Sequence, residues 1–167
     1  MDGPAGILTN LGTLNLNGGS IAGTVVNQGA ISLTTGSSSI GAGATQQSGP
    51  INVASGQTLT VGGSGLDWQG GDLLGPSASS YSLASLNFSG TGSRVLNGPT
   101  FNIASLNLPG GSLDVQAGTL NLSGVSTIAS GASLVLSSGT FTATGSLDNA
   151  GTLTKASTGT TSLAASL

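Results

Sequence analysis

The sequence predicts an all-β fold, a right-handed parallel β-helix (β-solenoid) of about eight coils with about 20 residues each. Three observations lead to this prediction. A Gly-x-Leu-x-Leu pattern recurs along the chain, for example at Gly12–Leu16 and Gly118–Leu122. Within each copy, apolar residues alternate with small polar ones, which is typical of a strand with one buried face. Strands this short are stable only when stacked on copies of themselves.

The second half of the chain keeps this spacing most regularly. Its strands are expected at the apolar pairs Phe101/Ile103, Leu106/Leu108, Leu113/Val115, Leu120/Leu122, Leu134/Leu136 and Phe141/Ala143. Val125 and Ile128 are expected to fill the one wider interval, and Leu147 and Leu153 continue the series. Turn signals in a β-sandwich come every 8–12 residues, so this closer spacing favours a coil with three strands per turn.

The first half follows the pattern less regularly, within one domain that is expected to span residues 1–167. Two stretches, 41–50 and 75–80, lack alternation and contain Pro, so we expect loops there that project from the coil. The candidate inward residues are Leu14, Ile21, Val25, Ile31, Ile51, Leu59, Leu66, Leu73, Leu83, Leu86 and Val95.

Three turns share an Asn-x-Gly sequence, at Asn10, Asn27 and Asn149. Asn and Gly both tolerate positive φ, and the Asn side chain can bond the local backbone. Such Asn residues, stacked in register, are expected to form ladders in which each amide satisfies the next.

Charged residues are scarce: the chain has two basic and five acidic residues among 167. Binding of nucleic acid by phosphate neutralisation needs several Lys or Arg on one face, so we expect no nucleic-acid partner. No window of about 18–20 residues is continuously apolar, so we expect no insertion into a membrane. Small neutral side chains also stack without the repulsion that like charges would cause, which gives the low charge a structural cause.

The chain contains neither Cys nor His, which excludes disulfides, thiol chemistry, Ser/His/Asp catalysis and the common zinc sites. Residues 62–67 match the first six positions of a calcium-binding nonapeptide, but no tandem copy follows, so no metal is expected. Residues 1–4 lack the basic start and apolar stretch of a signal peptide. We expect either a processed segment or an export signal outside this chain.

Four residues are the candidates for surface contacts. Asp67 and Asp72 would form a carboxylate pair for glycoside cleavage only if both were poised together, with Arg94 as the nearest cation. Trp68 and Tyr81 would stack on a sugar if exposed, although a buried Trp is the favoured alternative in a narrow solenoid. We therefore expect no catalytic residues and no cofactor.

A further alternative comes from three Thr-x-Thr sequences, which begin at Thr58, Thr140 and Thr152. Ice-binding β-solenoids present flat arrays of this kind, in which copies align one coil apart. Here the last two copies are only 12 residues apart, which argues against such an array.

The pattern resembles the β-helical repeats of filamentous-haemagglutinin-type exoproteins and autotransporter passenger domains of bacteria. The likeness covers most of the chain as a style of repeat. The residues that carry it are Gly12–Leu16, Gly118–Gly124, Asp148–Leu153 and Asp67–Gly75. These 167 residues contain neither the Asn-Pro-Asn-Gly element of the haemagglutinin secretion domain nor a sequence expected to form a translocator barrel.

The resemblance implies a non-catalytic structural or adhesive module of a bacterial surface or extracellular fibre. Its expected partners are further copies joined end to end and a host-surface or glycan receptor. A carbohydrate-binding or carbohydrate-cleaving β-helix and an ice-binding β-solenoid remain the alternatives.

Overall fold

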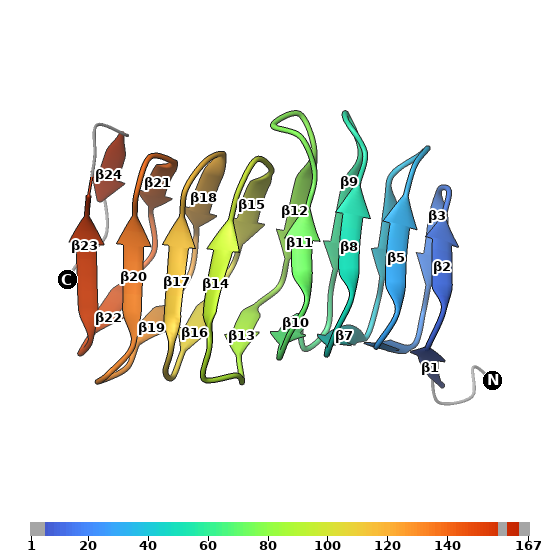
Figure 1. Ribbon diagram of the computed structural model, residues 1–167, viewed down its shortest axis with the longest axis horizontal. Helices are drawn as coiled ribbons and strands as arrows, with labels where there is room; N and C mark the ends of the chain where they lie inside the picture. Colours follow the sequence, from blue (N-terminus) through green and yellow to red (C-terminus); the bar gives the residue numbers. More distant parts are fainter. Residues whose placement is uncertain (1–5, 157–159, 164–167) are drawn as a thin grey trace.

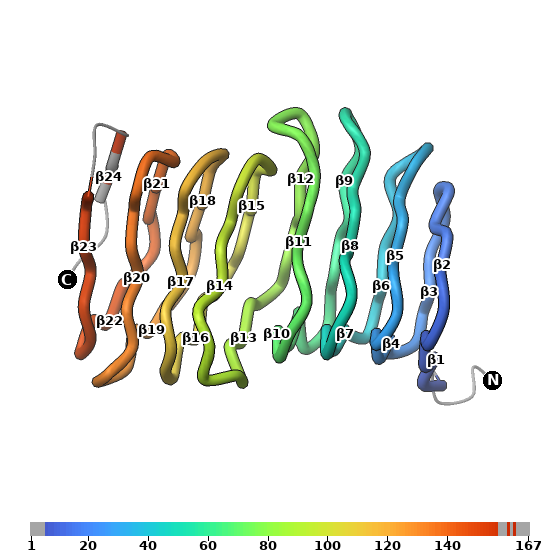
Figure 2. Tube along the Cα trace, viewed as in Figure 1, coloured from blue at the N-terminus to red at the C-terminus, as the bar shows by residue number. Residues whose placement is uncertain are grey.

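The computed structural model describes residues 6–156 and 160–163. In it the chain winds as one right-handed β-helix, rising along β2 (Thr13–Leu16), passing behind to β3 (Gly19–Ile21) and continuing towards the C-terminal end (Figures 1 and 2). The described part contains strands and turns without a helix, so it has no helix able to cross a membrane. The predicted fold class is confirmed.

Three faces make up the wall of the coil, and every third strand belongs to the same face. The first face is one sheet of β1 (Ile7–Asn10), β4 (Thr24–Asn27), β7 (Gly43–Gln46), β10 (Leu66–Trp68), β13 (Leu86–Phe88), β16 (Leu106–Leu108), β19 (Ser126–Ile128) and β22 (Leu147–Asn149). The third face is one sheet of β3, β6 (Ser38–Ile40), β9 (Thr58–Val61), β12 (Ser80–Leu83), β15 (Thr100–Ile103), β18 (Thr119–Leu122), β21 (Thr140–Ala143) and β24 (Thr161–Leu163).

The second face differs because it is divided into two sheets of four strands. One sheet contains β2, β5 (Ala30–Leu33), β8 (Pro50–Val53) and β11 (Asp72–Leu74). The other contains β14 (Ser93–Leu96), β17 (Ser112–Val115), β20 (Ser133–Leu136) and β23 (Thr152–Lys155). We call the interruption between β11 and β14 the seam.

All pairings are parallel, and equivalent residues lie 17 to 22 positions apart, close to the predicted 20. The first and last strands of the first face are seven steps apart, so the chain makes about seven full turns where about eight were expected. Leu113, Leu134 and Leu153 lie directly over one another. The predicted stacking of residues one coil apart is therefore confirmed.

The interior is filled by columns of buried apolar residues, as the alternation predicts. Leu113, Leu134 and Leu120 are all 0% exposed. Two predicted inward residues are wrong: Val95 is 42% exposed and Val125 is 70% exposed. Ser126 takes the inward position beside Val125, where its Oγ accepts a hydrogen bond from the Leu106 N–H at 3.1 Å.

One inward column begins with amides, which confirms the predicted Asn ladder for its first two members. Asn10 Nδ2 donates to Asn27 Oδ1 at 2.6 Å, and Asn27 Nδ2 donates to Gln46 Oε1 at 2.8 Å. Asn27 and Gln46 are 1% and 0% exposed, so their hydrogen bonds replace the water that burial removes.

One of the two predicted loops is wrong. Within 41–50, residues Gly43–Gln46 form β7, whose inward positions hold Ala44 and Gln46. Such a strand lacks the usual pair of large apolar residues, so its sequence shows no alternation. In the other stretch, residues 75–79 join β11 to β12 and project beyond the coil (Figure 1), whereas Ser80 already begins β12.

Candidate functional site

Trp68 and Tyr81 lie inside the coil, at 1% and 0% exposure. The expectation that they make surface contacts is wrong, and the alternative of a buried Trp holds. Trp68 packs edge-on to Phe88 with ring centroids 5.3 Å apart, and its Nε1 donates to the Gly71 carbonyl at 3.1 Å. The short strand β10 turns this residue inward by simple alternation after Leu66 and Asp67.

Tyr81 is stacked on Phe101 with ring centroids 4.8 Å apart. Its hydroxyl donates towards the carbonyls of Ile51 and Leu74, at 2.8 Å and 2.9 Å. Burial raises the pKa of Tyr81 well above its ordinary value, and the hydrogen bond to the Leu74 backbone lowers it in part. The phenol therefore stays neutral and serves as an interior hydrogen-bond donor.

Asp67 and Asp72 project from different faces, β10 of the first and β11 of the second. Asp67 accepts hydrogen bonds from Gln69 Nε2 at 2.7 Å and from the Ser89 hydroxyl. Asp72 is exposed. In the described part of the chain neither carboxylate forms an ion pair with Arg94.

Arg94 occupies an unexpected place, an inward position of β14. Its register partner is Leu113, and the same column continues to Leu134 and Leu153. The sequence Ser-Arg-Val-Leu inverts the usual pattern, so Arg94 lies inside while Val95 faces out. The guanidinium reaches the coil surface through the seam, because an unpaired charge cannot stay in the apolar interior.

The surroundings of the guanidinium explain how it is accommodated. It lies over the rings of Trp68 and Phe88, with its Cζ 5.9 Å and 6.0 Å from the ring centroids. Nη1 donates to the Ser93 carbonyl and Nη2 to the Gln69 carbonyl, whereas the buried Nε finds no partner among the described residues. Arg94 thus joins the two turns on either side of the seam, where the backbone ladder is missing.

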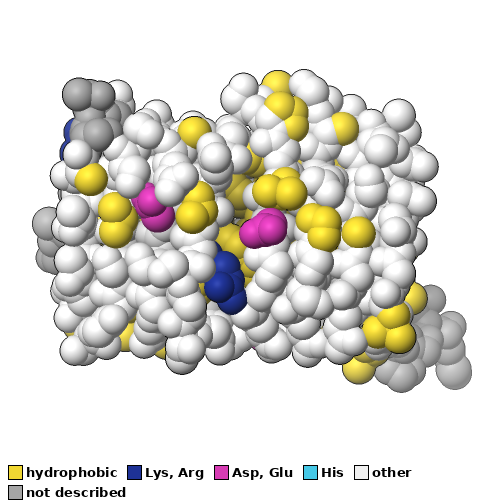
Figure 3. All heavy atoms as spheres, in the orientation of Figure 1, with side chains coloured by type: hydrophobic (Ala, Val, Ile, Leu, Met, Phe, Trp, Pro, Cys, Tyr) yellow, Lys and Arg dark blue, Asp and Glu magenta, His cyan; other side chains and the backbone are white. Residues whose placement is uncertain are grey.

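Figure 3 shows the second face as a neutral surface with one hollow near its middle. Hydrophobic side chains lie at the bottom of this hollow, between β11 and β14, beside a basic side chain and between two acidic ones. Leu74 on β11 and Val95 on β14 are exposed on either side, at 40% and 42%. No charge pattern in the sequence predicts this hollow. The one local signal is the order Arg94–Val95, which places the basic residue at the inward position.

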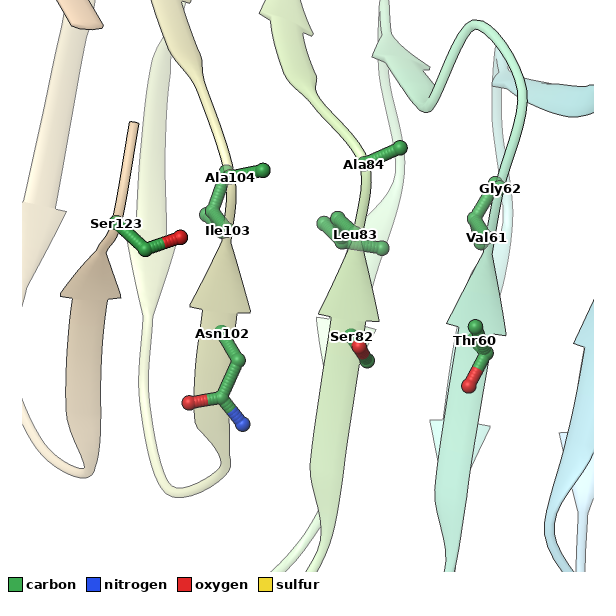
Figure 4. A pocket seen from close by; sticks show the side chains of 10 residues that line it. All are labelled: Thr60, Val61, Gly62, Ser82, Leu83, Ala84, Asn102, Ile103, Ala104 and Ser123. Atoms are coloured by element: carbon green, nitrogen blue, oxygen red, sulfur yellow. The ribbon is translucent and has the colours of Figure 1, made fainter. Parts of the chain in front are cut away.

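A second concave region lies where the third face bends towards the first (Figure 4). It has a volume of about 360 Å³ and follows the ends of β9, β12 and β15, reaching Ser123 after β18. Its polar side chains repeat once per turn, as Thr60, Ser82 and Asn102. All of its lining residues are uncharged, so it is a groove without acid or base groups.

The third face as a whole carries ordered hydroxyl and amide side chains. Its registers align Thr58 and Thr60 with Ser80 and Ser82, then with Thr100 and Asn102, Thr119 and Asn121, and Thr140 and Thr142. The Thr-x-Thr at Thr152 lies on the second face instead. Two of the three predicted Thr-x-Thr sequences therefore share one array, in which Asn102 Oδ1 accepts from Asn121 Nδ2 at 2.9 Å.

No three acidic side chains gather into a possible metal site in residues 6–156 and 160–163. Neither a protein-family model, nor a curated protein, nor a solved structure matches the chain.

Proposed function

We propose that this protein is a non-catalytic structural module, a stiff β-solenoid rod that associates end to end with further copies. The observation that carries the proposal is the in-register stacking of turns around continuous inward columns. Each turn is held by its neighbours on two uninterrupted ladders, so bending the rod would break many hydrogen bonds together. The resemblance of the repeats favours a bacterial surface or an extracellular fibre as its setting.

The first turn supports the association of copies. Ile7, Leu8 and Leu11 are 73%, 40% and 73% exposed, which is unusual for large apolar residues in this chain. Figure 3 shows hydrophobic side chains gathered at this end of the molecule. β1, β2 and β3 are also edge strands, whose free backbone groups can pair with another strand.

Sedimentation velocity of the purified chain over a wide range of concentration tests the proposal. We expect species that lengthen as the concentration rises, and Leu11→Lys should shift them towards the monomer by placing a charge at the junction. Val125→Lys is the matched control, because Val125 is equally exposed at 70% but lies on the side of the rod. A strict monomer at every concentration would reject the association of copies.

The adhesive part of the proposal places a receptor, such as a host-surface glycan, on the side of the rod. The uncharged groove at Thr60, Ser82 and Asn102 is the surface that would favour a neutral partner. The carbohydrate-cleaving alternative has less support, because Trp68 is buried and Asp67 and Asp72 lie on different faces. Binding of immobilised neutral glycans, lost on Ser82→Lys, would support the adhesive role, and its absence would reject this groove as the receptor site.

Ice binding is a second candidate function, favoured by the aligned hydroxyl and amide side chains of the third face. Measurement of ice growth in a protein solution tests it. The candidate requires that the native chain slows or shapes ice growth and that Asn121→Lys, which adds a charge to the array, removes the effect. Ordinary ice growth with the native chain would exclude it.

A further inference from the structure

We infer that copies of this chain join in one defined register, with Asn149 of one copy stacked on Asn10 of the next. This inference rests on the proposed end-to-end association and adds the contacts that define the junction. It follows from three features of the end turns: an amide column with open ends, a repeated turn sequence and a glycine that the single chain does not require.

Asn10 and Asn149 lie at opposite ends of the same inward column. The registers of the first face run from Asn10 through Asn27, Gln46 and Trp68 to Phe88, and from Leu108 through Ile128 to Asn149. Each amide in the ladder donates to the amide one turn towards the C-terminus. In the described residues Asn10 Oδ1 accepts no hydrogen bond, and Asn149 Nδ2 donates none.

These two free atoms are complementary in the direction the ladder already follows. If the last turn of one copy precedes the first turn of another, Asn149 Nδ2 donates to Asn10 Oδ1, as Asn10 Nδ2 donates to Asn27 Oδ1. The Oδ1 of Asn149 is already used, since it accepts from the Gly151 N–H at 3.2 Å. Its Nδ2 donor group has no such partner within the part of the chain that the structure describes and is available to a neighbour.

The turn sequence at the two ends supplies a template for the junction. Asn149-Ala-Gly-Thr-Leu153 and Asn10-Leu-Gly-Thr-Leu14 share the Asn-x-Gly-Thr-Leu order. Within the chain, the turn at Asn10 already stacks on the related turn at Asn27. There the Asn10 carbonyl accepts from the N–H groups of Gln28 and Gly29, and the Gly12 carbonyl accepts from the Ala30 N–H at 2.7 Å.

Gly12 occupies the turn position at which the next two turns require glycine. A Cβ on Gly29 would lie 2.0 Å from the Gly12 carbonyl oxygen, and one on Gly49 would lie 2.0 Å from the Gly29 oxygen. Glycine is therefore required wherever the preceding turn places a carbonyl there. A Cβ on Gly12 itself would meet nothing within 4 Å, and its φ is not positive. In the proposed junction the Gly151 carbonyl would lie in this space.

The same register aligns the apolar columns, with one exception. Leu147 would stack on Leu8, and Leu153 on Leu14, both at inward positions. Lys155, however, continues the inward column of Leu136 and would stack on Leu16. Its ammonium must extend to the surface when the junction forms, so the lysine weakens association, and Lys155→Leu should strengthen it.

The Gly12→Ala variant separates the junction from the fold. We expect an unchanged urea midpoint for the single chain, because the added methyl group meets open space, and at least a tenfold weaker association. Gly110→Ala is the matched control, since a Cβ on Gly110 also meets nothing within 4 Å but lies away from both ends. Association of Gly12→Ala at the native strength would overturn the proposed register.

The Asn149→Asp variant tests the amide contact. The carboxylate keeps an acceptor for the Gly151 N–H but replaces the Nδ2 donor with a second acceptor, which would face Asn10 Oδ1. We expect about tenfold weaker association, equal to about 1.4 kcal/mol. Asn107→Asp makes the same exchange at an outward position of the first face, between the uncharged Asn87 and Thr127, and equal losses in both variants would contradict the amide contact.

Cross-linking measures the register directly, because the chain has no cysteine of its own. Stacking Asn149 on Asn10 places outward Asp148 of one copy beside Thr9 of the next. A Thr9→Cys/Asp148→Cys chain treated with a short bis-maleimide should give a series of linked oligomers. The control is Thr45→Cys/Asp148→Cys. Thr45 lies two turns beyond Thr9 in the same outward column, so this variant should give no linked oligomers.

The outcomes distinguish this inference from the proposed function. Association without the Thr9–Asp148 link would overturn the register and leave end-to-end association in place. No association of the native chain at any concentration would overturn both.

Discussion

The inward column of the first face contains two contrasting regions. Its first three turns carry Asn10, Asn27 and Gln46, each joined to the next by a hydrogen bond between side-chain amides. Its middle turns carry Trp68 and Phe88, followed by Leu108 and Ile128, and no side-chain hydrogen bond joins these four residues to one another. The backbone ladder is the same in both regions, so the difference lies in the side chains.

This contrast shows how a solenoid combines stability with specificity. Apolar contacts have no direction and tolerate exchange of similar side chains. A buried amide costs free energy unless its partner is correctly placed, so each amide selects its neighbour. The amide region begins at the first turn, where selection of a neighbouring copy would matter, and the aromatic region lies in the middle.

The largest effect is expected from a charge placed in the apolar columns. Leu120→Asp puts a carboxylate between Phe101 and Phe141 at a site with 0% exposure. We expect a loss of more than about 4 kcal/mol, enough to unfold the chain, because the charge has no partner. Urea unfolding followed by circular dichroism measures it, with outward Asn121→Asp as the control. A normal cooperative transition for Leu120→Asp would show that the residue does not face inward.

The amide region should respond strongly to loss of one member. Asn27→Leu removes the acceptor of Asn10 Nδ2 and the donor to Gln46 Oε1. The amides of Asn10 and Gln46 then stay at 9% and 0% exposure without these hydrogen bonds. We expect a cost of about 2–4 kcal/mol in the free energy of unfolding. Ile128→Leu, an exchange in the apolar region of the same column, should cost less than about 1.5 kcal/mol. Equal effects of the two substitutions would remove the contrast between the regions.

Tyr81 places a polar group within an aromatic column, and its effect depends on pH. Since burial raises its pKa in the folded state, its contribution to stability is complete below about pH 10 and falls as the pH rises beyond that value. We expect a slope of about 1.4 kcal/mol per pH unit. Tyr81 is the only tyrosine of the chain, so phenolate absorbance should appear only as the protein unfolds. Gradual ionisation of the folded chain near pH 10 would contradict its burial.

The smallest effect is expected from the exposed amide pair beside the buried ladder. Gln28 Nε2 donates to Gln47 Oε1 at 2.6 Å on the surface. Gln28→Ala should change the free energy of unfolding by less than about 0.5 kcal/mol, because water replaces the lost contact. A cost as large as that of Asn27→Leu would mean that burial does not determine how much a side-chain amide hydrogen bond contributes to stability.

The sequence was sufficient for the fold because its alternation and spacing state which residues face inward and which share a column. It failed where an inward position carries an unusual residue. β7 was missed because it places Ala44 and Gln46 inside, and Val95 was misplaced because Arg94 takes the inward position beside it. The path of the Arg94 guanidinium depends on the seam, which no local pattern in the sequence describes.

The candidate site was less predictable than the fold. Asp67 and Asp72 are close in sequence, but the bend between β10 and β11 sends them to different faces. Trp68 was a surface candidate because of its chemistry, whereas its position in β10 turns it inward. The open ends of the amide column emerged only when the registers connected Asn10 with Asn149 along one face.

Cryo-electron microscopy of the concentrated native chain tests the central claim most directly. We expect rods in single file, with the strand spacing of about 4.8 Å continuing without interruption from the last turn of one copy to the first turn of the next. Rods that remain separate, or that pack only side by side, would contradict it.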